Sequence, residues 1–221
     1  HKVLGNERIV WNKNSSPYLG KEYTIDEINK SLQFFSDLLT YEKCSQTDML
    51  NLISDSKIIS LFCGKSESGR RALGNRSIIA DPRSNEMKDI INKKVKHRQW
   101  YRPFAPSILR EYVADWFELD IDSPYMSKVI KFKSEMGKKV PAVNHFDGTA
   151  RLQTVTIEDN KPYYQLLKEW NDISGVPILL NTSFNDREPI VETPNDAIKC
   201  FLNTDIDHLY FLEYGILVSK R

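Results

Sequence analysis

The stretch Pro177-Ile178-Leu179-Leu180-Asn181-Thr182-Ser183-Phe184-Asn185 changes from apolar to polar within a few residues. Its aliphatic run, opened by a proline, predicts a buried strand over residues 178–181. The preceding residues 162–173 place apolar side chains at helical spacing, and Gly175 ends that pattern. A helix followed by a buried strand that ends in hydrogen-bonding side chains is typical of α/β domains, where ligand sites lie at strand-to-loop junctions.

The same alternation continues outward along the chain. Apolar residues at helical spacing run from a cap at Thr24 to Leu39, and another such helix begins from a cap at Ser84 or Asn85. Further helices are expected at 47–54 and 193–201, strands at 57–63, 77–80, 107–109, 129–132 and 152–157, and a closing hairpin at 209–212 and 215–218. The sequence therefore predicts an α/β fold on a twisted mixed sheet flanked by helices.

The bulk composition narrows the function classes. With 221 residues, 40% of them hydrophobic, the chain suffices for one large domain or a domain with an arm. The net charge of +1 does not favour nucleic acid as the main partner, whereas the basic stretch 70–102 indicates a small anionic ligand. Three scattered cysteines, without a C-x-x-C pair, signal peptide or membrane-spanning run, indicate a cytoplasmic protein with no membrane partner.

Lys96-His97-Arg98 is a K-x-R motif at the expected end of the helix that begins near residue 85. Arg102 follows, and Pro103 stiffens the segment, so these cations are expected to be held in place. Fixed cations suit the phosphates of a nucleotide. A basic helix end that complements the helix dipole is the simpler interpretation of the lysines. The aromatic residues between the cations could stack a base or pack: Trp100, Tyr101 and Phe104.

Ser183 and Asn185 form an S-x-N motif directly after the predicted strand, beside Asn181 and Thr182. A hydroxyl and an amide in fixed positions can set the geometry of a phosphate or of a carbamate-like acceptor. An Asx or Ser/Thr turn would use the same residue types and stays open as an alternative. A serine nucleophile is not expected, because no nucleophile elbow and no recognisable His or acidic partner accompany it.

Residues 64–76 combine turn glycines with Arg70, Arg71 and Arg76. Glycine lets the backbone approach a ligand, and arginine binds phosphate through two nitrogens, so this loop is a candidate anion site. It is not a P-loop, because the upstream glycine that a P-loop requires is missing. The competing interpretation is a solvated loop with a structural ion pair to Asp81.

The run His145-Phe146-Asp147-Gly148 is a polar turn that leads into a strand with Arg151 and Gln153. We expect Asp147 to accept backbone hydrogen bonds in this turn and not to bind a metal, because two ligands do not make a site. Arg151 and Gln153 alternate onto one face of the strand, and that face is expected to border a cleft.

Four long runs resemble one family: ESGRRALGNRSIIADPR at 67–83, WYRPFAPS at 100–107, PAVNHFDGTARLQTV at 141–155 and LLNTSFNDREPIVETP at 179–194. In this order they resemble the C-terminal domain of the O-carbamoyltransferases that act on nodulation factors and antibiotics, over about residues 17–218. That domain is YrdC-like. It is similar in fold to the threonylcarbamoyl-adenylate synthases, whose K-x-R and S-x-N pairs look like Lys96/Arg98 and Ser183/Asn185.

The resemblance implies half of a two-step enzyme. Residues 24–221 would be the YrdC-like domain, which converts carbamoyl phosphate and Mg-ATP to carbamoyl-adenylate without a prosthetic group. An N-terminal actin/sugar-kinase-like domain with a bound metal would then pass the carbamoyl group to a hydroxyl acceptor. The resemblance implies that this chain lacks that domain and that residues 1–23 would be its tail or the linker to it.

The site residues are expected in three groups, none of which binds a metal. The catalytic group joins the two motifs: Lys96, Arg98, Ser183 and Asn185. The group that binds ATP and carbamoyl phosphate comprises Arg71, Arg102, Arg151, Asn181 and Thr182. The residues expected to support them from behind are His145, Asp147 and Gln153.

Two other functions stay open. The first is a YrdC-like module that binds nucleotide or RNA without turnover, which strong salt sensitivity with long RNA would reveal. The second is a standalone threonylcarbamoyl-adenylate synthase. The H-x-D-G-T-x-R turn at 145–151 and the R-P-F-A-P run at 102–106 argue against the second function.

Overall fold

The computed structural model describes residues 16–221, so most of the predicted linker, residues 1–15, lies outside the described residues. The strands of the described part are β1 Leu39–Lys43, β2 Ile59–Phe62, β3 Arg76–Ala80, β4 Ala105–Leu109, β5 Lys128–Lys131, β6 Thr149–Val155, β7 Ile178–Ser183, β8 His208–Phe211 and β9 Ile216–Lys220. They form one sheet in the order β1-β9-β8-β2-β3-β7-β4-β6-β5. The pairs β2/β8 and β4/β6 are parallel and the others antiparallel, which confirms the predicted mixed sheet.

The helices are α1 Ile25–Phe34, α2 Gln46–Ser54, α3 Met87–Ile90, α4 Val113–Trp116, α5 Ser134–Lys139, α6 Lys161–Ser174 and α7 Pro194–Asn203, with a π-helical turn η1 Ile91–Val95 and 3₁₀ turns η2 Arg110–Tyr112 and η3 Leu212–Tyr214. The predicted caps at Thr24 and Thr193 are confirmed, and each forms a capping box with the acidic residue three positions on. Gly175 ends α6 with φ of 71°, the left-handed conformation that glycine adopts without strain.

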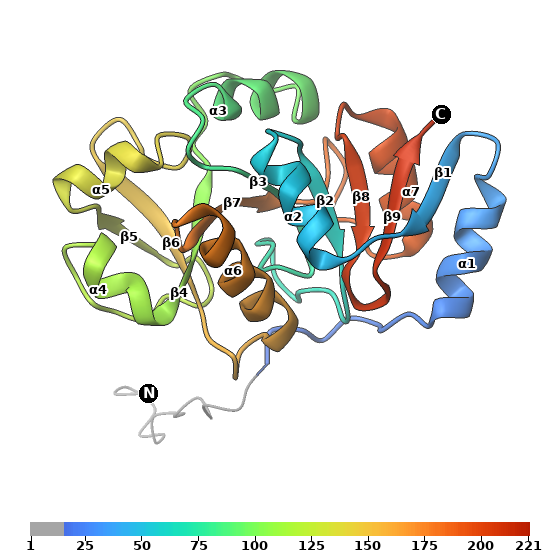
Figure 1. The fold of residues 1–221 in the computed structure, drawn as a ribbon, viewed down its shortest axis with the longest axis horizontal. Helices are drawn as coiled ribbons and strands as arrows, with labels where there is room; N and C mark the ends of the chain where they lie inside the picture. Colours follow the sequence, from blue (N-terminus) through green and yellow to red (C-terminus); the bar gives the residue numbers. More distant parts are fainter. Residues whose placement is uncertain (1–15) are drawn as a thin grey trace, which may run out of the picture.

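Helices cover both faces of the sheet (Figure 1). Alternate residues of each central strand point to opposite faces, so Ile79 of β3 packs in one core cluster while Ile78 packs in the other. The first cluster includes residues of α2 and α6, and the second includes residues of α1 and α7. The helices α1, α2, α6 and α7 each bury an apolar stripe against one face of the sheet, which confirms the predicted α/β architecture.

Two predicted elements are wrong in detail. The helix that begins at Thr24 ends at Phe34, and Leu39 opens the edge strand β1, which pairs with β9. The partner strand lies far along the chain, so no local pattern indicated β1. Neither Ser84 nor Asn85 caps α3, because its N-cap is Glu86 without a side-chain hydrogen bond.

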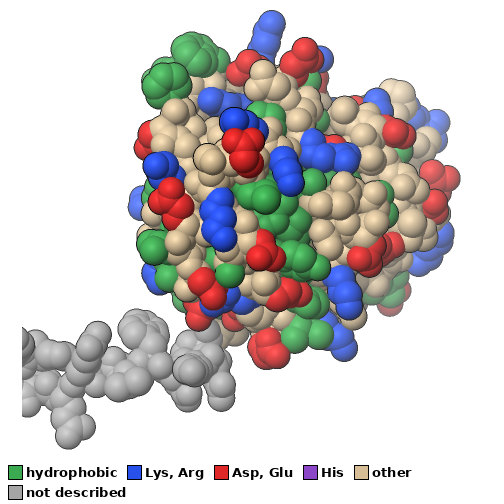
Figure 2. Space-filling view, turned by 60° about the vertical axis from the view of Figure 1, so that its left-hand side comes forward, with side chains coloured by type: hydrophobic (Ala, Val, Ile, Leu, Met, Phe, Trp, Pro, Cys, Tyr) green, Lys and Arg blue, Asp and Glu red, His purple; other side chains and the backbone are tan. Residues whose placement is uncertain are grey.

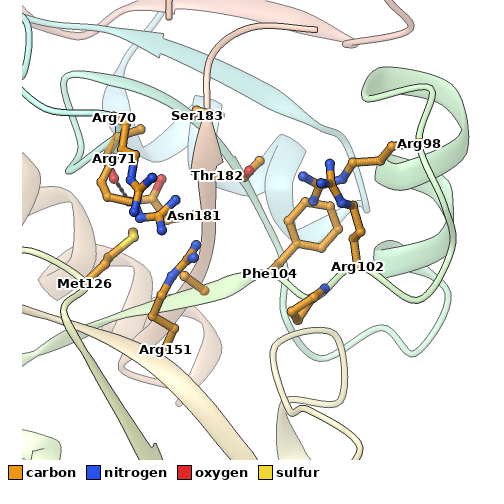
Figure 3. A pocket seen from close by; sticks show the side chains of 13 residues that line it. Arg70, Arg71, Arg98, Arg102, Phe104, Met126, Arg151, Asn181, Thr182 and Ser183 are labelled. Carbon is orange, nitrogen blue, oxygen red and sulfur yellow. Dashed lines mark hydrogen bonds between the residues drawn. The ribbon is translucent and has the colours of Figure 1, made fainter. Parts of the chain in front are cut away.

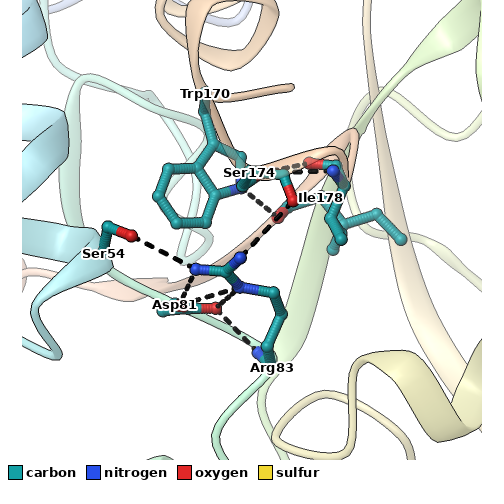
Figure 4. A network of polar contacts seen from close by, with 7 residues as sticks. Ser54, Asp81, Arg83, Trp170, Ser174 and Ile178 are labelled. Carbon is teal, nitrogen blue, oxygen red and sulfur yellow. Dashed lines mark hydrogen bonds and ion pairs between the residues drawn. The ribbon is translucent and has the colours of Figure 1, made fainter. Parts of the chain in front are cut away.

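The competing interpretation of residues 64–76, a structural ion pair with Asp81, is also wrong. Asp81 pairs with Arg83, whose Nη2 lies 2.7 Å from Oδ2 of Asp81. The same guanidinium group donates to Oγ of Ser54 in α2 (3.3 Å) and to the carbonyl oxygen of Ser174 in α6 (3.4 Å) (Figure 4). This network ties the end of β3 to α2 and α6 on one face of the sheet, and none of the arginines of residues 64–76 takes part in it.

The described part of the predicted linker, residues 16–23, is irregular and contacts the domain. The amide of Ser68 donates to the carbonyl oxygen of Pro17 (2.8 Å), and the hydroxyl of Tyr18 donates to that of Leu73 (3.0 Å). In the face that Figure 2 presents, side chains of both charge signs are interspersed. Within residues 16–221, no helix is long and apolar enough to cross a membrane.

Candidate functional site

The K-x-R and S-x-N motifs meet in the structure. Nζ of Lys96 donates to the carbonyl oxygen of Asn185 (2.6 Å) and to its Oδ1 (2.9 Å), and also to the carbonyl oxygen of Ser183. The hydroxyl of Ser183 in turn donates to Oδ1 of Asn185 (2.7 Å). Lys96 therefore holds the loop after β7 in one conformation, although the two motifs are more than 80 residues apart.

The side chains of Lys96 and Arg98 point in different directions because of the backbone conformation between them. His97 has φ of 43°, a left-handed conformation that is uncommon outside glycine, and its Nδ1 lies 3.0 Å from Oδ2 of Asp186. Lys96 is only 5% exposed, and its burial, followed by the charge of Arg98, lowers the pKa of Lys96 to about 7. Arg98 points instead into a neighbouring cavity (Figure 3).

This cavity of about 290 Å³, here called the arginine cavity, is lined by five arginines: Arg70, Arg71, Arg98, Arg102 and Arg151. Arg70 and Arg71 come from the loop after β2, Arg151 from β6, and the other two from the segment between η1 and β4. Figure 3 shows Arg70 and Arg71 on one side of the cavity and Arg98 and Arg102 on the opposite side, with Arg151 between the two pairs. In the described chain, none of the five forms an ion pair with a carboxylate.

The unpaired cations repel one another. Burial, followed by the charges of Arg102 and Arg151, lowers the pKa of Arg98 to about 10. Burial, followed by the charges of Arg71 and Arg70, also lowers the pKa of Arg151. A bound polyanion would relieve this repulsion and would accept hydrogen bonds from several guanidinium groups, so the cavity suits phosphate groups.

The sequence analysis missed Asn92, which orients two of these arginines. Asn92 lies in η1 and is 1% exposed. Its Oδ1 accepts a hydrogen bond from Nε of Arg98 (2.7 Å), and its Nδ2 donates to the carbonyl oxygens of Trp100 (3.2 Å) and Arg102 (2.9 Å). One buried amide thus fixes the Arg98 side chain and the turn that carries Arg102. The sequence signal was weak, since it consists of one asparagine beside the apolar side of a helix.

The loop that carries Arg70 and Arg71 is fixed at its base. Oε1 of Glu67 accepts hydrogen bonds from the backbone amides of Leu73 (2.7 Å) and Asn75 (2.9 Å). Arg76, the third arginine of this stretch, is fully buried and donates to the carbonyl oxygen of Cys63 (2.6 Å). The loop therefore divides its arginines: two line the cavity and one supports the backbone.

Asn181 lines the arginine cavity, whereas Gln153 does not border it as expected, and both side chains are almost fully buried. Nδ2 of Asn181 donates to Oε1 of Gln153 (2.8 Å) and to the carbonyl oxygen of Ala72 (3.3 Å), and Nε2 of Gln153 donates to that of Leu73 (2.9 Å). These amides join β6 and β7 to the arginine loop. Thr182 and Ser183 line the cavity beside Asn181, whereas Lys96 and Asn185 do not.

His145 and Asp147 belong to a neighbouring groove instead. Oδ1 of Asp147 accepts hydrogen bonds from the amide (3.1 Å) and the hydroxyl (2.7 Å) of Thr149, which confirms the predicted structural turn. Burial lowers the pKa of His145, which favours the neutral form of its imidazole. Across residues 16–221, no group of three or more His, Cys, Asp or Glu side chains is placed to hold a metal ion.

The sequence of this chain is similar to those of known proteins. An uncharacterized protein of Synechocystis, sll1178, is 39% identical over 95% of this chain and 38% of its own length. The nodulation protein NolNO of Sinorhizobium fredii is 42% identical over 97% of this chain and 31% of its own length. The chain thus spans only about a third of the length of these curated relatives.

A crystal structure of full-length HypF in a phosphate- and nucleotide-bound form superposes with a TM-score of 0.48 at 16% identity, covering 83% of this chain and 22% of that chain. The family model described as Carbamoyltransferase C-terminus matches residues 50–218, which include the four runs that carried the resemblance. The chain therefore belongs to the carbamoyltransferase C-terminus family.

Proposed function

We propose that this domain binds Mg-ATP and carbamoyl phosphate and forms carbamoyl-adenylate, as the activating half of an O-carbamoyltransferase. The observation that carries the proposal is the arginine cavity, in which five guanidinium groups without carboxylate partners surround about 290 Å³. Both substrates are phosphate anions, and guanidinium groups bind phosphate oxygens through two parallel hydrogen bonds. Membership of the carbamoyltransferase family supports a carbamoyl donor as the second substrate.

In the proposed reaction, carbamoyl phosphate and water give carbamate and inorganic phosphate. An oxygen of the carbamate then attacks the α-phosphorus of ATP, and the bond to the β-phosphate breaks to release pyrophosphate. Such a step requires positioning and charge neutralisation more than a protein nucleophile. Arg98, Arg102 and Arg151 would neutralise the phosphates, and Mg²⁺ would arrive with ATP.

We assign Lys96 a different role from the arginines. Its ammonium group is already surrounded by oxygens of Ser183 and Asn185 and does not line the arginine cavity. Lys96 would therefore act through the S-x-N loop, by holding the Ser183 hydroxyl at the cavity wall, where it can contact a phosphate or the carbamate. Arg71 and Thr182, which also line the cavity, would complete the anion site.

Transfer of the carbamoyl group to a hydroxyl acceptor is proposed to need a partner domain of the actin/sugar-kinase type, in the cytoplasm. The curated relatives are about three times as long as the part that this chain covers, which leaves room for such a domain.

The test is to incubate the protein with Mg-ATP, with and without carbamoyl phosphate, and to follow pyrophosphate together with carbamoyl-adenylate by mass spectrometry. Pyrophosphate that depends on carbamoyl phosphate is expected, and it should disappear in Arg151→Ala. Asn51→Ala, an exposed residue of α2, is the matched control. Nucleotide binding without pyrophosphate would contradict the proposed reaction and indicate a binding module, and stimulation by L-threonine would indicate a threonylcarbamoyl-adenylate synthase.

A further inference from the structure

A second groove, here called the aromatic groove, lies beside the arginine cavity. It encloses about 730 Å³, and the two share Pro103 in their walls. Its aromatic lining consists of Trp100 and Tyr101 on one turn and Phe146 on another. Trp100 is 71% exposed, Tyr101 60%, and Phe146 is fully exposed, whereas Phe104 of the same segment is buried. Large exposed aromatic rings gathered along one groove are typical of a binding surface.

The turn that presents Trp100 and Tyr101 is fixed by hydrogen bonds. Nδ2 of Asn92 donates to the carbonyl oxygens of Trp100 and Arg102, and the amide of Arg102 donates to the carbonyl oxygen of Gln99 (3.2 Å). The rings of Trp100 and Tyr101 lie 6.0 Å apart at 83°, an edge-to-face contact that supports both rings. The backbone that presents the rings is therefore fixed before any ligand arrives, which reduces the entropy cost of binding.

The segment from Arg98 to Arg102 places charged side chains on one side and aromatic side chains on the other. Arg98 and Arg102 line the arginine cavity, while Trp100 and Tyr101 line the aromatic groove. The groove has charges of both signs, Lys88 with Asp89 and Asp147, so it does not attract a polyanion by itself. One turn thus offers cations on one side and flat aromatic surfaces on the other, which matches a ligand with an anionic end and an aromatic end.

We propose that the aromatic groove binds the nucleobase of the ATP whose triphosphate lies in the arginine cavity, with the base stacked on Trp100. This inference rests on the proposed function, because it requires ATP as the ligand of the cavity. Phosphates in the cavity and a base on an adjacent aromatic ring are joined by the ribose, which would pass over the shared residue Pro103. Stacking tolerates any base, so the groove contributes affinity for nucleotides rather than a choice among them.

The test compares ATP with inorganic tripolyphosphate by calorimetry, because tripolyphosphate carries the charge without the base. Wild type is expected to bind ATP more tightly. Trp100→Ala should lower the affinity for ATP roughly tenfold, the usual effect of removing one stacking partner, and leave that for tripolyphosphate unchanged. Trp100→Phe should restore most of the ATP affinity, because it retains an aromatic face. Phe34→Ala, an equally exposed ring of α1, is the control and should change neither.

The other possible results show whether the base site or the anion site is wrong. If Trp100→Ala binds ATP as tightly as wild type, the groove does not hold the base, and its aromatic rings serve another partner such as a protein surface. If ATP and tripolyphosphate weaken equally, Trp100 only supports the arginines, and the inference is also overturned. If wild type binds tripolyphosphate but gains nothing from the base of ATP, the groove is excluded while the anion site stands. If wild type binds neither ligand, the proposed function itself fails.

Discussion

Replacing Asn92 by alanine should weaken anion binding indirectly, because Asn92 holds Arg98 in position. The change removes two hydrogen bonds to backbone carbonyls and one to the guanidinium group of Arg98. A neutral bond contributes about 1 kcal/mol and a charged one about 1.5 kcal/mol, so the free energy of unfolding should fall by roughly 3.5 kcal/mol. Domains are commonly stable by about 5–15 kcal/mol, so the variant is expected to remain folded.

The effect on binding follows from the freed side chain. Without Asn92, the Arg98 guanidinium group must be ordered by the ligand itself, and Arg102 loses the support of its turn. We expect the affinity for tripolyphosphate to fall about tenfold, equivalent to about 1.4 kcal/mol. Urea unfolding measures the stability, and calorimetry at low salt measures the affinity. Asn51→Ala, an exposed asparagine in α2, should change stability by less than about 0.5 kcal/mol and leave binding unchanged.

A double-mutant cycle separates positioning from general damage. If Asn92 acts through Arg98, then Asn92→Ala should cost much less affinity in an Arg98→Met background than in wild type. Equal losses in both backgrounds would refute the role of Asn92 in orienting Arg98. A loss of stability without any loss of affinity would show that Asn92 serves the fold alone.

Three further predictions concern charge and capping. Arg151→Leu should lower tripolyphosphate affinity at least tenfold without lowering the free energy of unfolding, because it removes a half-buried cation that Arg71 and Arg70 repel. Unchanged affinity would exclude Arg151 from the anion site. Lys96 has a pKa of about 7 in the folded protein, against an ordinary value of 10.5, so between these values the unfolded chain binds more protons than the folded one. The free energy of unfolding of the wild type should therefore rise from pH 7 to pH 9, relative to that of Lys96→Met, by up to about 1.4 kcal/mol per pH unit. Parallel stability curves for the two proteins would contradict that shift. Thr193→Ala should cost about 1 kcal/mol of unfolding free energy through the lost cap of α7 and leave tripolyphosphate binding intact, which urea unfolding and calorimetry check.

Local patterns predicted most of the fold because their causes are local. The caps at Thr24 and Thr193 depend on residues three positions apart, and the amphipathic stripe of α6 depends on helical spacing. The edge strand β1 had no such signal, because only its pairing with β9 at the other end of the chain makes it a strand. The π-helical turn η1 also escaped prediction, since helical spacing does not distinguish it from an α-helix.

The candidate site was likewise predicted from the sequence only in part. The sequence by itself determined which residue types are present: arginines in a glycine-containing loop and in a segment stiffened by proline, an S-x-N pair after a buried strand, and a family membership carried by four long runs. It could not assign directions to these side chains. Lys96 and Arg98 are two residues apart, yet a left-handed φ at His97 turns one toward the S-x-N loop and the other into the arginine cavity.

Only the tertiary structure decided which cations are free. Arg76 donates hydrogen bonds to backbone carbonyls, and Arg83 is paired with Asp81. The five arginines of the cavity have no carboxylate partner among the described residues. The same holds for the aromatic residues, since Phe104 packs inside while Trp100 stays exposed. The physical reason is that pairing and burial depend on residues that are distant in sequence, and only the folded sheet brings those residues together.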